Sequence, residues 1–291
     1  MKKLRLSIMF IISFLIIGIS FLYYVDLNER NDFCVEIPEN EPEILLSFEE
    51  RNYISEEEKA KRRQDYLETN MECYTEEPDK YKVDVLDEYK EVYEQYDHIY
   101  GWLKIDGTLI NDPVMFTPWD QDYYLYRNQD GKDFKAGTLY IGKDTVLYPN
   151  NSNIIIYGHN MKNQTKFGSL KKYRYKAYYD EHKVIHFDTM EEKADYIVVA
   201  AFYARILYVN EDGFRYYRHD YFDNEEEFND YMANIEKMRF YDTGVEVSYG
   251  DNLITLSTCS YHTQDGRFVV VAKKMTQEDK KKYLTESESW Q

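Results

Sequence analysis

From Gly101 onwards, the hydrophobic residues of the chain come in short apolar and β-branched runs separated by polar turn residues. These runs are GWLKIDGTLINDPVMF, KAGTLYIGK, SNIIIYGH, KVIHFDT, ADYIVVAAFYARILY, VEVSYGDNLITLSTC and GRFVVVAKK. Their length is typical of strands, and Asp106-Gly107 within the first run is a hairpin signal. Many closely spaced strands with few helices predict a mainly β protein built on a closed or nearly closed barrel.

Helical spacing interrupts this pattern in three places. The folded body is expected to begin with a helix that runs up to Gly101, because apolar residues recur there at helical spacing, at Leu86, Tyr89, Val92, Tyr93 and Tyr96. Residues 224–240, NEEEFNDYMANIEKMRF, predict an extra helix before the strand that ends in a cysteine, and residues 161–173 give a weaker helical signal. The polar residues 276–291 form a tail that is expected to fray.

The N-terminus carries a different signal. Residues 6–25, LSIMFIISFLIIGISFLYYV, are uncharged, and roughly 20 apolar residues match the thickness of a bilayer core. Lys2, Lys3 and Arg5 precede this run and Asp26 follows it, so the pattern predicts a transmembrane signal anchor, with residues 1–5 in the cytoplasm and the rest outside the cell. A cleaved signal peptide is the alternative, but no A-x-A-like cleavage site follows the run.

The sequence between anchor and body is dominated by Glu, Asp, Lys and Asn. Residues 26–85 are therefore interpreted as a polar helical stalk or linker, for which partial disorder stays open, and residues 86–275 as the folded domain. At 291 residues and 43% hydrophobic, the chain has enough apolar side chains for a sizeable core. Its formal charge of −18 argues against a polyanionic partner such as nucleic acid.

Three cysteines are present. Cys34 and Cys73 lie in the predicted stalk, where they could pair or stay reduced, since spacing alone decides neither. Cys259 stands apart near the C-terminus, and an odd cysteine in an exported protein is a candidate reactive thiol.

The surroundings of Cys259 favour chemistry. It ends one strand-like run, and Arg267 opens the next, so a hairpin between the two runs would set them opposite each other at the open end of the barrel. A free thiol with a pKa of about 8.5 is mostly protonated at neutral pH, and a neighbouring cation favours the thiolate. A guanidinium does not lose its proton, which makes Arg267 a candidate electrostatic stabiliser.

Proton transfer calls for a further group, and histidine is the usual one. His159 is the best candidate, because it follows the apolar run SNIIIYG and Gly158 lets the backbone turn before it. The other histidines are weaker candidates: His98, His182, His186, His219 and His262. A single Cys or His at a strand end is usually structural, but three chemically matched residues at three strand ends favour a catalytic site.

These segments resemble a known family. TLSTC with the arginine that opens the next strand, and NIIIYGHNM followed by FGSLKKY, are similar to motifs of the sortases of Gram-positive bacteria, which are membrane-anchored cysteine transpeptidases. The resemblance is closest to class B. It is carried further by GWLKIDGTLINDPV, DYYLY, KAGTLYI and YRHDYFDNEEEFNDYMANIEKMRFYDTGVEV, and it extends from about residue 86 to residue 274.

The resemblance implies a site and a reaction. Cys259 is then the nucleophile, His159 the general acid and base, and Arg267 the stabiliser of oxyanion and substrate. Cysteine attack on the threonine of a C-terminal sorting motif, of the Asn-Pro-x-Thr-Asn type in class B, would form a thioester on a surface-protein substrate. An amine of a peptidoglycan precursor would resolve this thioester, with neither metal nor other cofactor. Ser257 shares the strand face of Cys259 by alternation and is a candidate for substrate contact.

Two positions depart from the class B pattern. Gln121, a candidate substrate-binding residue, stands where class B members often carry Asn, and SYHTQDG with His262 replaces a turn that is commonly more acidic. These departures bear on which sorting motif is preferred.

Three alternatives to this function remain open from the sequence. A pilin-polymerising sortase would use a lysine of its partner as acceptor. A membrane-tethered adhesin or scaffold would have an inert barrel. A papain-like protease is disfavoured, because the histidine precedes the cysteine and no C-G-S-C-W motif exists.

Overall fold

A computed structural model describes residues 84–117, 119–120, 122–142, 145, 152–208 and 210–284. The predicted anchor, nearly all of the predicted stalk, Cys34, Cys73 and Gln121 lie outside these residues. Among the helices of the described part, none combines the length and the apolar character that a membrane-spanning segment needs.

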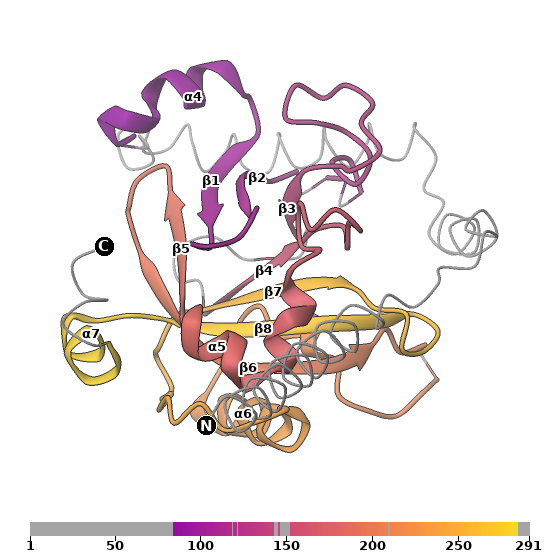
Figure 1. The fold of residues 1–291 in the computed structure, drawn as a ribbon, viewed down its shortest axis with the longest axis vertical. Helices are drawn as coiled ribbons and strands as arrows, with labels where there is room; N and C mark the ends of the chain where they lie inside the picture. The colour runs from indigo at the N-terminus through magenta and orange to yellow at the C-terminus, as the bar shows by residue number, and fades with distance from the viewer. Residues whose placement is uncertain are drawn as a thin grey trace, which may run out of the picture. The chain divides into compact units, whose positions relative to one another are not determined.

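The described residues form eight strands that close into one barrel, as the sequence predicts (Figure 1). The strands are β1 (Ile99–Lys104), β2 (Asn111–Met115), β3 (Leu139–Ile141), β4 (Asn153–Tyr157), β5 (Val184–Thr189), β6 (Asp195–Arg205), β7 (Leu253–Cys259) and β8 (Gly266–Lys274). Around the barrel their order is β1-β2-β3-β4-β7-β8-β6-β5. Two pairs, β2 with β3 and β4 with β7, are parallel, and the other pairs are antiparallel.

The start of the barrel confirms one local prediction and corrects another. β1 and β2 pair as the expected hairpin, with Lys104 opposite Asn111 and Gly107 at φ 72° in the turn. The preceding helix is shorter than predicted, since η1 (Asp87–Tyr89) and α4 (Lys90–Gln95) end before His98. Gly101 belongs to β1 because it pairs with both β2 and β5, and a Cβ there would lie 2.4 Å from the carbonyl oxygen of Asp188.

The predicted extra helix is α6 (Glu225–Met238), and it lies where the sequence places it. Asn224 caps it, because its side-chain oxygen accepts a hydrogen bond from the backbone N–H of Glu227 at 3.0 Å. The weaker helical signal corresponds to η2 (Leu170–Arg174), which is followed by α5 (Lys176–Glu181), and η3 (Tyr216–Arg218) precedes α6.

The first part of the C-terminal tail is ordered rather than frayed. Residues 277–283 form α7 (Gln277–Tyr283), which starts with a capping box between Thr276 and Asp279. Asp279 also accepts a hydrogen bond from Lys273 of β8 at 3.0 Å, and Leu284 packs against buried residues of the body. These tertiary contacts hold a segment whose polar composition alone predicts disorder.

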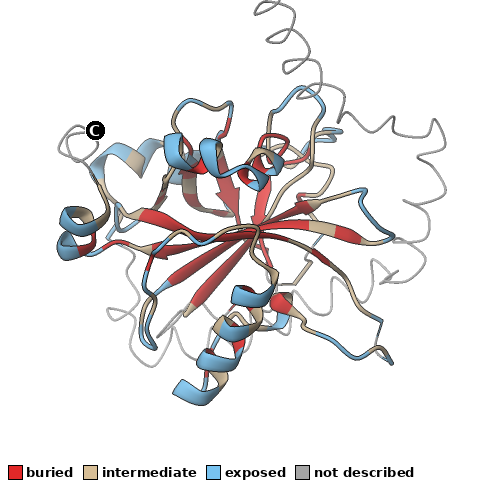
Figure 2. Cartoon of the chain, turned by 60° about the horizontal axis from the view of Figure 1, so that its bottom comes forward, coloured by how far each residue is buried: buried red, intermediate tan, exposed pale blue. Residues whose placement is uncertain are grey.

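Two buried layers lie on opposite sides of the barrel wall. The interior cluster takes one set of alternating residues, such as Leu256 of β7 and Val270 of β8. The outer cluster takes the other set, such as Leu253 and Val269, and packs them against Tyr231 and its neighbours on α6. Figure 2 shows buried residues along the strands and exposed residues on the outer side of α6. The side chains of β7 and β8 therefore alternate between the barrel interior and the outer layer.

A charged cluster joins the barrel to α7. His186 of β5 lies with Nδ1 2.7 Å from Asp195 Oδ1 and with Nε2 3.1 Å from Asp106 Oδ2, and Lys280 of α7 also pairs with Asp195. The hydrogen bond to Asp195 is the main cause that raises the pKa of His186, against partial burial, and Asp106 adds to it. The same hydrogen bond is the main cause that lowers the pKa of Asp195 to about 2.

This cluster predicts a pH-dependent contribution to stability. A histidine whose pKa is raised by folding stabilises the fold fully below its unfolded pKa of about 6.5, and the contribution is lost as the pH rises through the folded pKa. Replacing His186 by Asn should therefore lower the melting temperature most at about pH 6 and progressively less as the pH rises above about 7. Thermal unfolding followed by circular dichroism measures this difference. A gap between the two proteins that stays constant with pH would contradict the assignment.

Candidate active site

Cys259 and Arg267 lie directly opposite each other in the β7–β8 hairpin, as the sequence predicts. Their position on the barrel wall was not predicted. Cys259 continues the outward-facing row of Ser257, and Arg267 continues the row of Val269, so both lie at a strand end but on the outer face. Cys259 is half-buried and is a free cysteine.

The electrostatics of Arg267 reflect this location. Burial opposes its charge, yet attraction to Cys259, followed by Tyr216 and Tyr140, raises the pKa of Arg267 above its ordinary value. The guanidinium donates to the carbonyl oxygen of Gly266 at 3.0 Å. Arg267 is thus a permanent cation, half-buried next to the thiol.

His159 reaches the same edge of the barrel through the parallel pairing of β4 with β7. Tyr157 pairs with Ser257, and the backbone N–H of Gly158 donates to the carbonyl oxygen of Ser257 at 3.2 Å. Residues two positions beyond this pair, His159 and Cys259, therefore leave their strands side by side. Glycine suits this close approach, because a Cβ at position 158 would lie 2.5 Å from a methyl carbon of Leu139 and 2.9 Å from a ring carbon of Phe167, so these side chains would have to shift.

The imidazole of His159 has a defined orientation. Its Nε2 lies 2.8 Å from the carbonyl oxygen of Leu125, and since a carbonyl only accepts, Nε2 carries the hydrogen and Nδ1 is the basic nitrogen. The ring also lies against Tyr126, with centroids 5.3 Å apart. Burial lowers the pKa of His159; the bond to Leu125 opposes this shift and Lys166 adds to it. His159 is therefore neutral at pH 7 and able to accept a proton.

Asn160 connects the histidine loop to the cysteine strand. Its side-chain amide donates to the carbonyl oxygen of Cys259 at 2.9 Å. Sequence reasoning did not single out this residue, although it directly follows His159 in NIIIYGHNM. The bond restrains the segment carrying the base relative to the segment carrying the thiol.

Ser257 lies on the same strand face as Cys259, as predicted, but its side chain is buried. It is 1% exposed, and its hydroxyl lies 2.7 Å from the hydroxyl of Tyr216 in η3. Burial raises the pKa of Tyr216 to about 12, with Arg267 opposing the shift, so the phenol stays protonated. Contact of Ser257 with a substrate stays a prediction, and so does that of Gln121, which lies outside the described residues.

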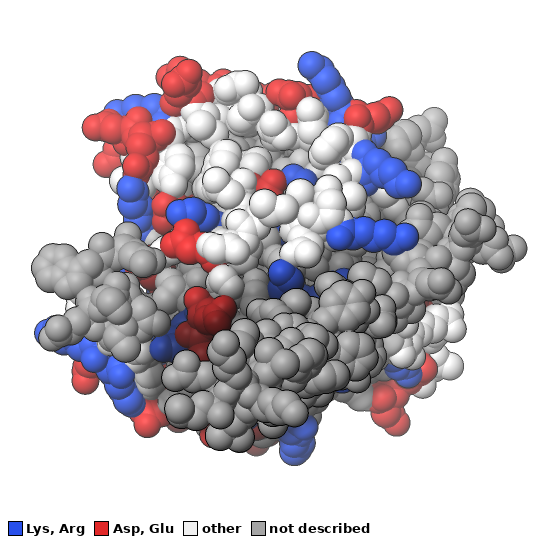
Figure 3. All heavy atoms as spheres, viewed as in Figure 1, with Lys and Arg blue, Asp and Glu red and all other residues white. Residues whose placement is uncertain are grey.

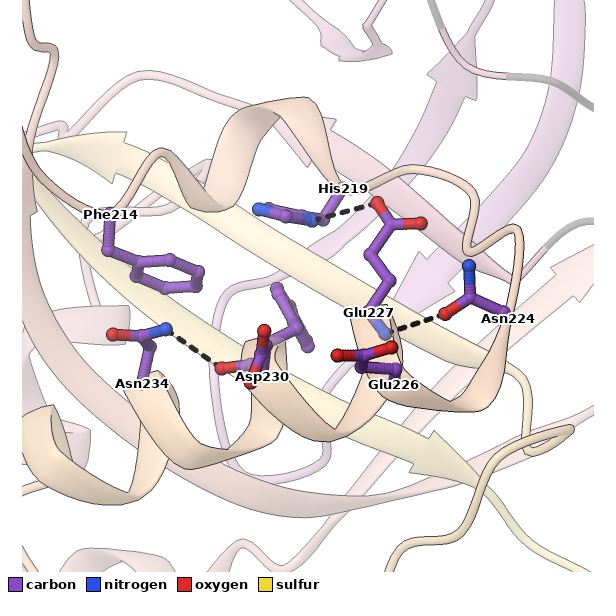
Figure 4. A pocket seen from close by; sticks show the side chains of 8 residues that line it. Phe214, His219, Asn224, Glu226, Glu227, Asp230 and Asn234 are labelled. Carbon is purple, nitrogen blue, oxygen red and sulfur yellow. Dashed lines mark hydrogen bonds and ion pairs between the residues drawn. The ribbon is translucent and has the colours of Figure 1, made fainter.

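Of the other candidate histidines, His262 lies in the loop that follows Cys259, whereas His219 lies away from the three predicted catalytic residues. His262 stacks on Tyr203 at 4.2 Å, and its Nδ1 lies 3.0 Å from the hydroxyl of Ser260. His219 lines a separate pocket of about 350 Å³ between residues 214–224, which precede α6, and α6 itself (Figure 4). The lining of that pocket includes neither Cys259, His159 nor Arg267.

Comparison with known proteins identifies the family of this chain. The family model described as Sortase domain matches residues 118–275, a range that includes His159, Cys259 and Arg267. The chain belongs to the sortase family.

Its relatives are sortases of class B. Sortase B of Listeria monocytogenes is 30% identical over 195 residues, which are 66% of this chain and 76% of that protein. The crystal structure of sortase B from Bacillus anthracis in complex with AAEK1 is similar with a TM-score of 0.57 at 32% identity, covering 67% of this chain and 87% of that one. A sortase B complexed with triglycine has a TM-score of 0.59 at 25% identity, covering 75% and 99%. Sortases are cysteine transpeptidases, so membership sets aside the papain-like alternative.

The buried pair of Ser257 and Tyr216 predicts coupled effects on stability. Ser257→Ala and Tyr216→Phe should each cost about 1–3 kcal/mol, because each leaves one buried hydroxyl without its partner. The double variant should cost clearly less than the sum, because it removes both hydroxyls. Urea unfolding of the four proteins completes this cycle. Additive losses would show that the hydroxyls do not interact.

Proposed function

We propose that this sortase cleaves a C-terminal sorting motif of the Asn-Pro-x-Thr-Asn type at its threonine and transfers the protein to a peptidoglycan amine. The observation that supports the proposal is the strand pairing, by which His159, two residues after β4, Cys259 at the end of β7 and Arg267 near the start of β8 follow from adjoining strand ends. The class B relatives support it for the type of motif.

The first half of the reaction would form the thioester. Nδ1 of His159 takes the thiol proton of Cys259, and the sulfur attacks the threonine carbonyl carbon. Negative charge then develops on the carbonyl oxygen, where the guanidinium of Arg267 stabilises it. As the tetrahedral intermediate collapses, His159 gives its proton to the departing amide nitrogen, which leaves as an amine.

The second half would reverse these roles. An acceptor amine attacks the thioester carbon, the neutral imidazole of His159 removes the amine proton, and the sulfur leaves and is reprotonated. A related sortase B binds triglycine, and a glycine peptide carries the kind of primary amine that this step needs. A pilin lysine would pass through the same steps, so the acceptor proposal rests on the class B relatives.

The proposed layout of the chain follows the sequence. Residues 6–25 would anchor the protein in the cell membrane with the catalytic domain outside the cell, residues 26–85 would form the stalk, and residues 86–275 the catalytic domain. The membership in a family of cell-envelope enzymes supports this placement.

The proposed function depends first on Cys259. Cys259→Ala should abolish both peptide cleavage and transfer to an added amine, while folding stays intact, because no other described residue at this strand end carries a thiol. The measurement incubates the protein with a sorting-motif peptide and a glycine peptide, and identifies the thioester and the product by mass spectrometry. Cys34→Ala and Cys73→Ala serve as matched controls and should keep turnover. Appreciable turnover in the Cys259 variant would refute the assignment.

A second prediction separates charge from geometry at Arg267. If a directed guanidinium stabilises the oxyanion, Arg267→Ala should lose roughly 10²–10³ in rate. Arg267→Lys should also be clearly impaired, because lysine lacks the planar set of donors. Turnover and melting temperature are to be measured on the same sample. A variant that melts earlier but turns over normally at low temperature would leave Arg267 a purely structural role.

A further inference from the structure

One segment of this acidic chain is positively charged. Asp and Glu make up 54 of 291 residues, or about four in every 20, yet residues 160–179 contain none. The same segment holds six cations, Lys162, Lys166, Lys171, Lys172, Arg174 and Lys176. It begins directly after His159 and makes up most of the β4–β5 connection, with η2 and the first four residues of α5, whose last two residues are Asp180 and Glu181.

The fold turns most of these cations outward. Leu170 and Tyr173 of η2 are buried in the interior cluster and attach the segment to the barrel. Lys162, Lys171 and Arg174 are exposed on the solvent side. A short element with apolar residues on one side and cations on the other presents its charge to a partner outside the molecule.

Part of the positive charge is neutralised and part is not. Lys166 pairs with Asp112 at 2.6 Å, and Lys176 pairs with Asp180 at 2.7 Å. Lys172 donates to the neutral amide of Gln164 at 2.7 Å. For Lys162 and Lys171, the described residues supply no ion pair. Residues 160–179 therefore keep a net positive charge, and they follow His159 directly in the chain.

An exposed aromatic residue lies within the same surface. Tyr175 is 50% exposed, and the guanidinium of Arg174 lies 6.0 Å from its ring centroid. Tyrosine and lysine side chains together are typical of surfaces that meet a membrane interface, where the ring sits at headgroup level and the cations meet phosphates. We infer that residues 160–179 contact the anionic phospholipid headgroups of the membrane.

The rest of the charge distribution would make this contact selective. With a formal charge of −18, most of the molecule is repelled by an anionic surface. Figure 3, for example, shows acidic side chains gathered over α4, on another part of the molecule. The inference rests on the proposed anchor, which would keep the domain at high local concentration near the bilayer. Contact through residues 160–179 would turn the ends of β4 and β7 toward the membrane surface.

The test uses the full-length protein with vesicles of phosphatidylcholine, alone or mixed with phosphatidylglycerol. Lysine acylation rates are read by mass spectrometry, together with the fraction of protein that sediments with the vesicles. Lys162, Lys171 and Lys172 should react several-fold more slowly on the mixed vesicles, and high salt should abolish the difference. Lys237 of α6, which is also exposed, is the matched control and should react equally on both.

A triple variant with Lys162, Lys171 and Lys172 replaced by Gln should still cleave a sorting peptide in detergent. Chemical labelling of Tyr175, read by mass spectrometry, should be slower on the mixed vesicles in the unchanged protein and equal on both vesicles in the variant. Equal lysine rates on both vesicles would overturn the inference while leaving the anchor in place. Sedimentation with neither vesicle would overturn both the anchor and the lipid contact. Equal protection by soluble poly(glycerol phosphate), at the same phosphate concentration, would assign the surface to a wall polymer and refute the lipid proposal.

Discussion

The site depends on β7 being paired on both edges. Its parallel partner β4 ends beside it, and its antiparallel partner β8 begins beside it, so one edge of the barrel receives His159, Cys259 and Arg267 from three separate stretches of chain. Because strand pairing sets positions to within one residue, a shift of β8 by one position would turn Arg267 to the barrel interior. The backbone hydrogen bonds of three strands thus place the chemistry, and the Asn160 bond to the Cys259 carbonyl restrains it further.

The outer layer explains why this chemistry can exist on a barrel wall. α6 and η3 cover the outward face of β6, β7 and β8, which buries Tyr216 and Tyr231 beside the row that ends in Cys259. Partial burial makes each charge there more consequential than in water. On the neighbouring segment, the ring of His159 is buried against Tyr126, and this burial lowers its pKa, so the imidazole is neutral and can accept a proton. Attraction to Cys259 and the neighbouring phenols raises the pKa of Arg267 despite its own burial.

Charge is also distributed unevenly on a larger scale. The His186 cluster links β5, β6 and α7 away from the site. Its carboxylates form ion pairs with side chains of the same domain. The β4–β5 connection, in contrast, carries cations that its own neighbours only partly neutralise. This acidic molecule therefore carries a basic segment that follows His159 directly in the chain.

The sequence by itself determined the barrel, the β1–β2 hairpin, α6 and the opposition of Cys259 to Arg267, because alternation, turn residues and caps act over a few neighbouring positions. Two boundaries were wrong for tertiary reasons. The first helix ends at Gln95 because Ile99 and Tyr100 already belong to β1, which pairs with β2 and β5, and α7 forms because Lys273 and the outer cluster hold it. Only the tertiary structure decided that β4 lies parallel to β7, that the site is on the outer face, and that Ser257 bonds to Tyr216, 41 positions earlier in the chain. No local pattern encodes which distant strand becomes a neighbour, since that choice depends on how all eight strands close together.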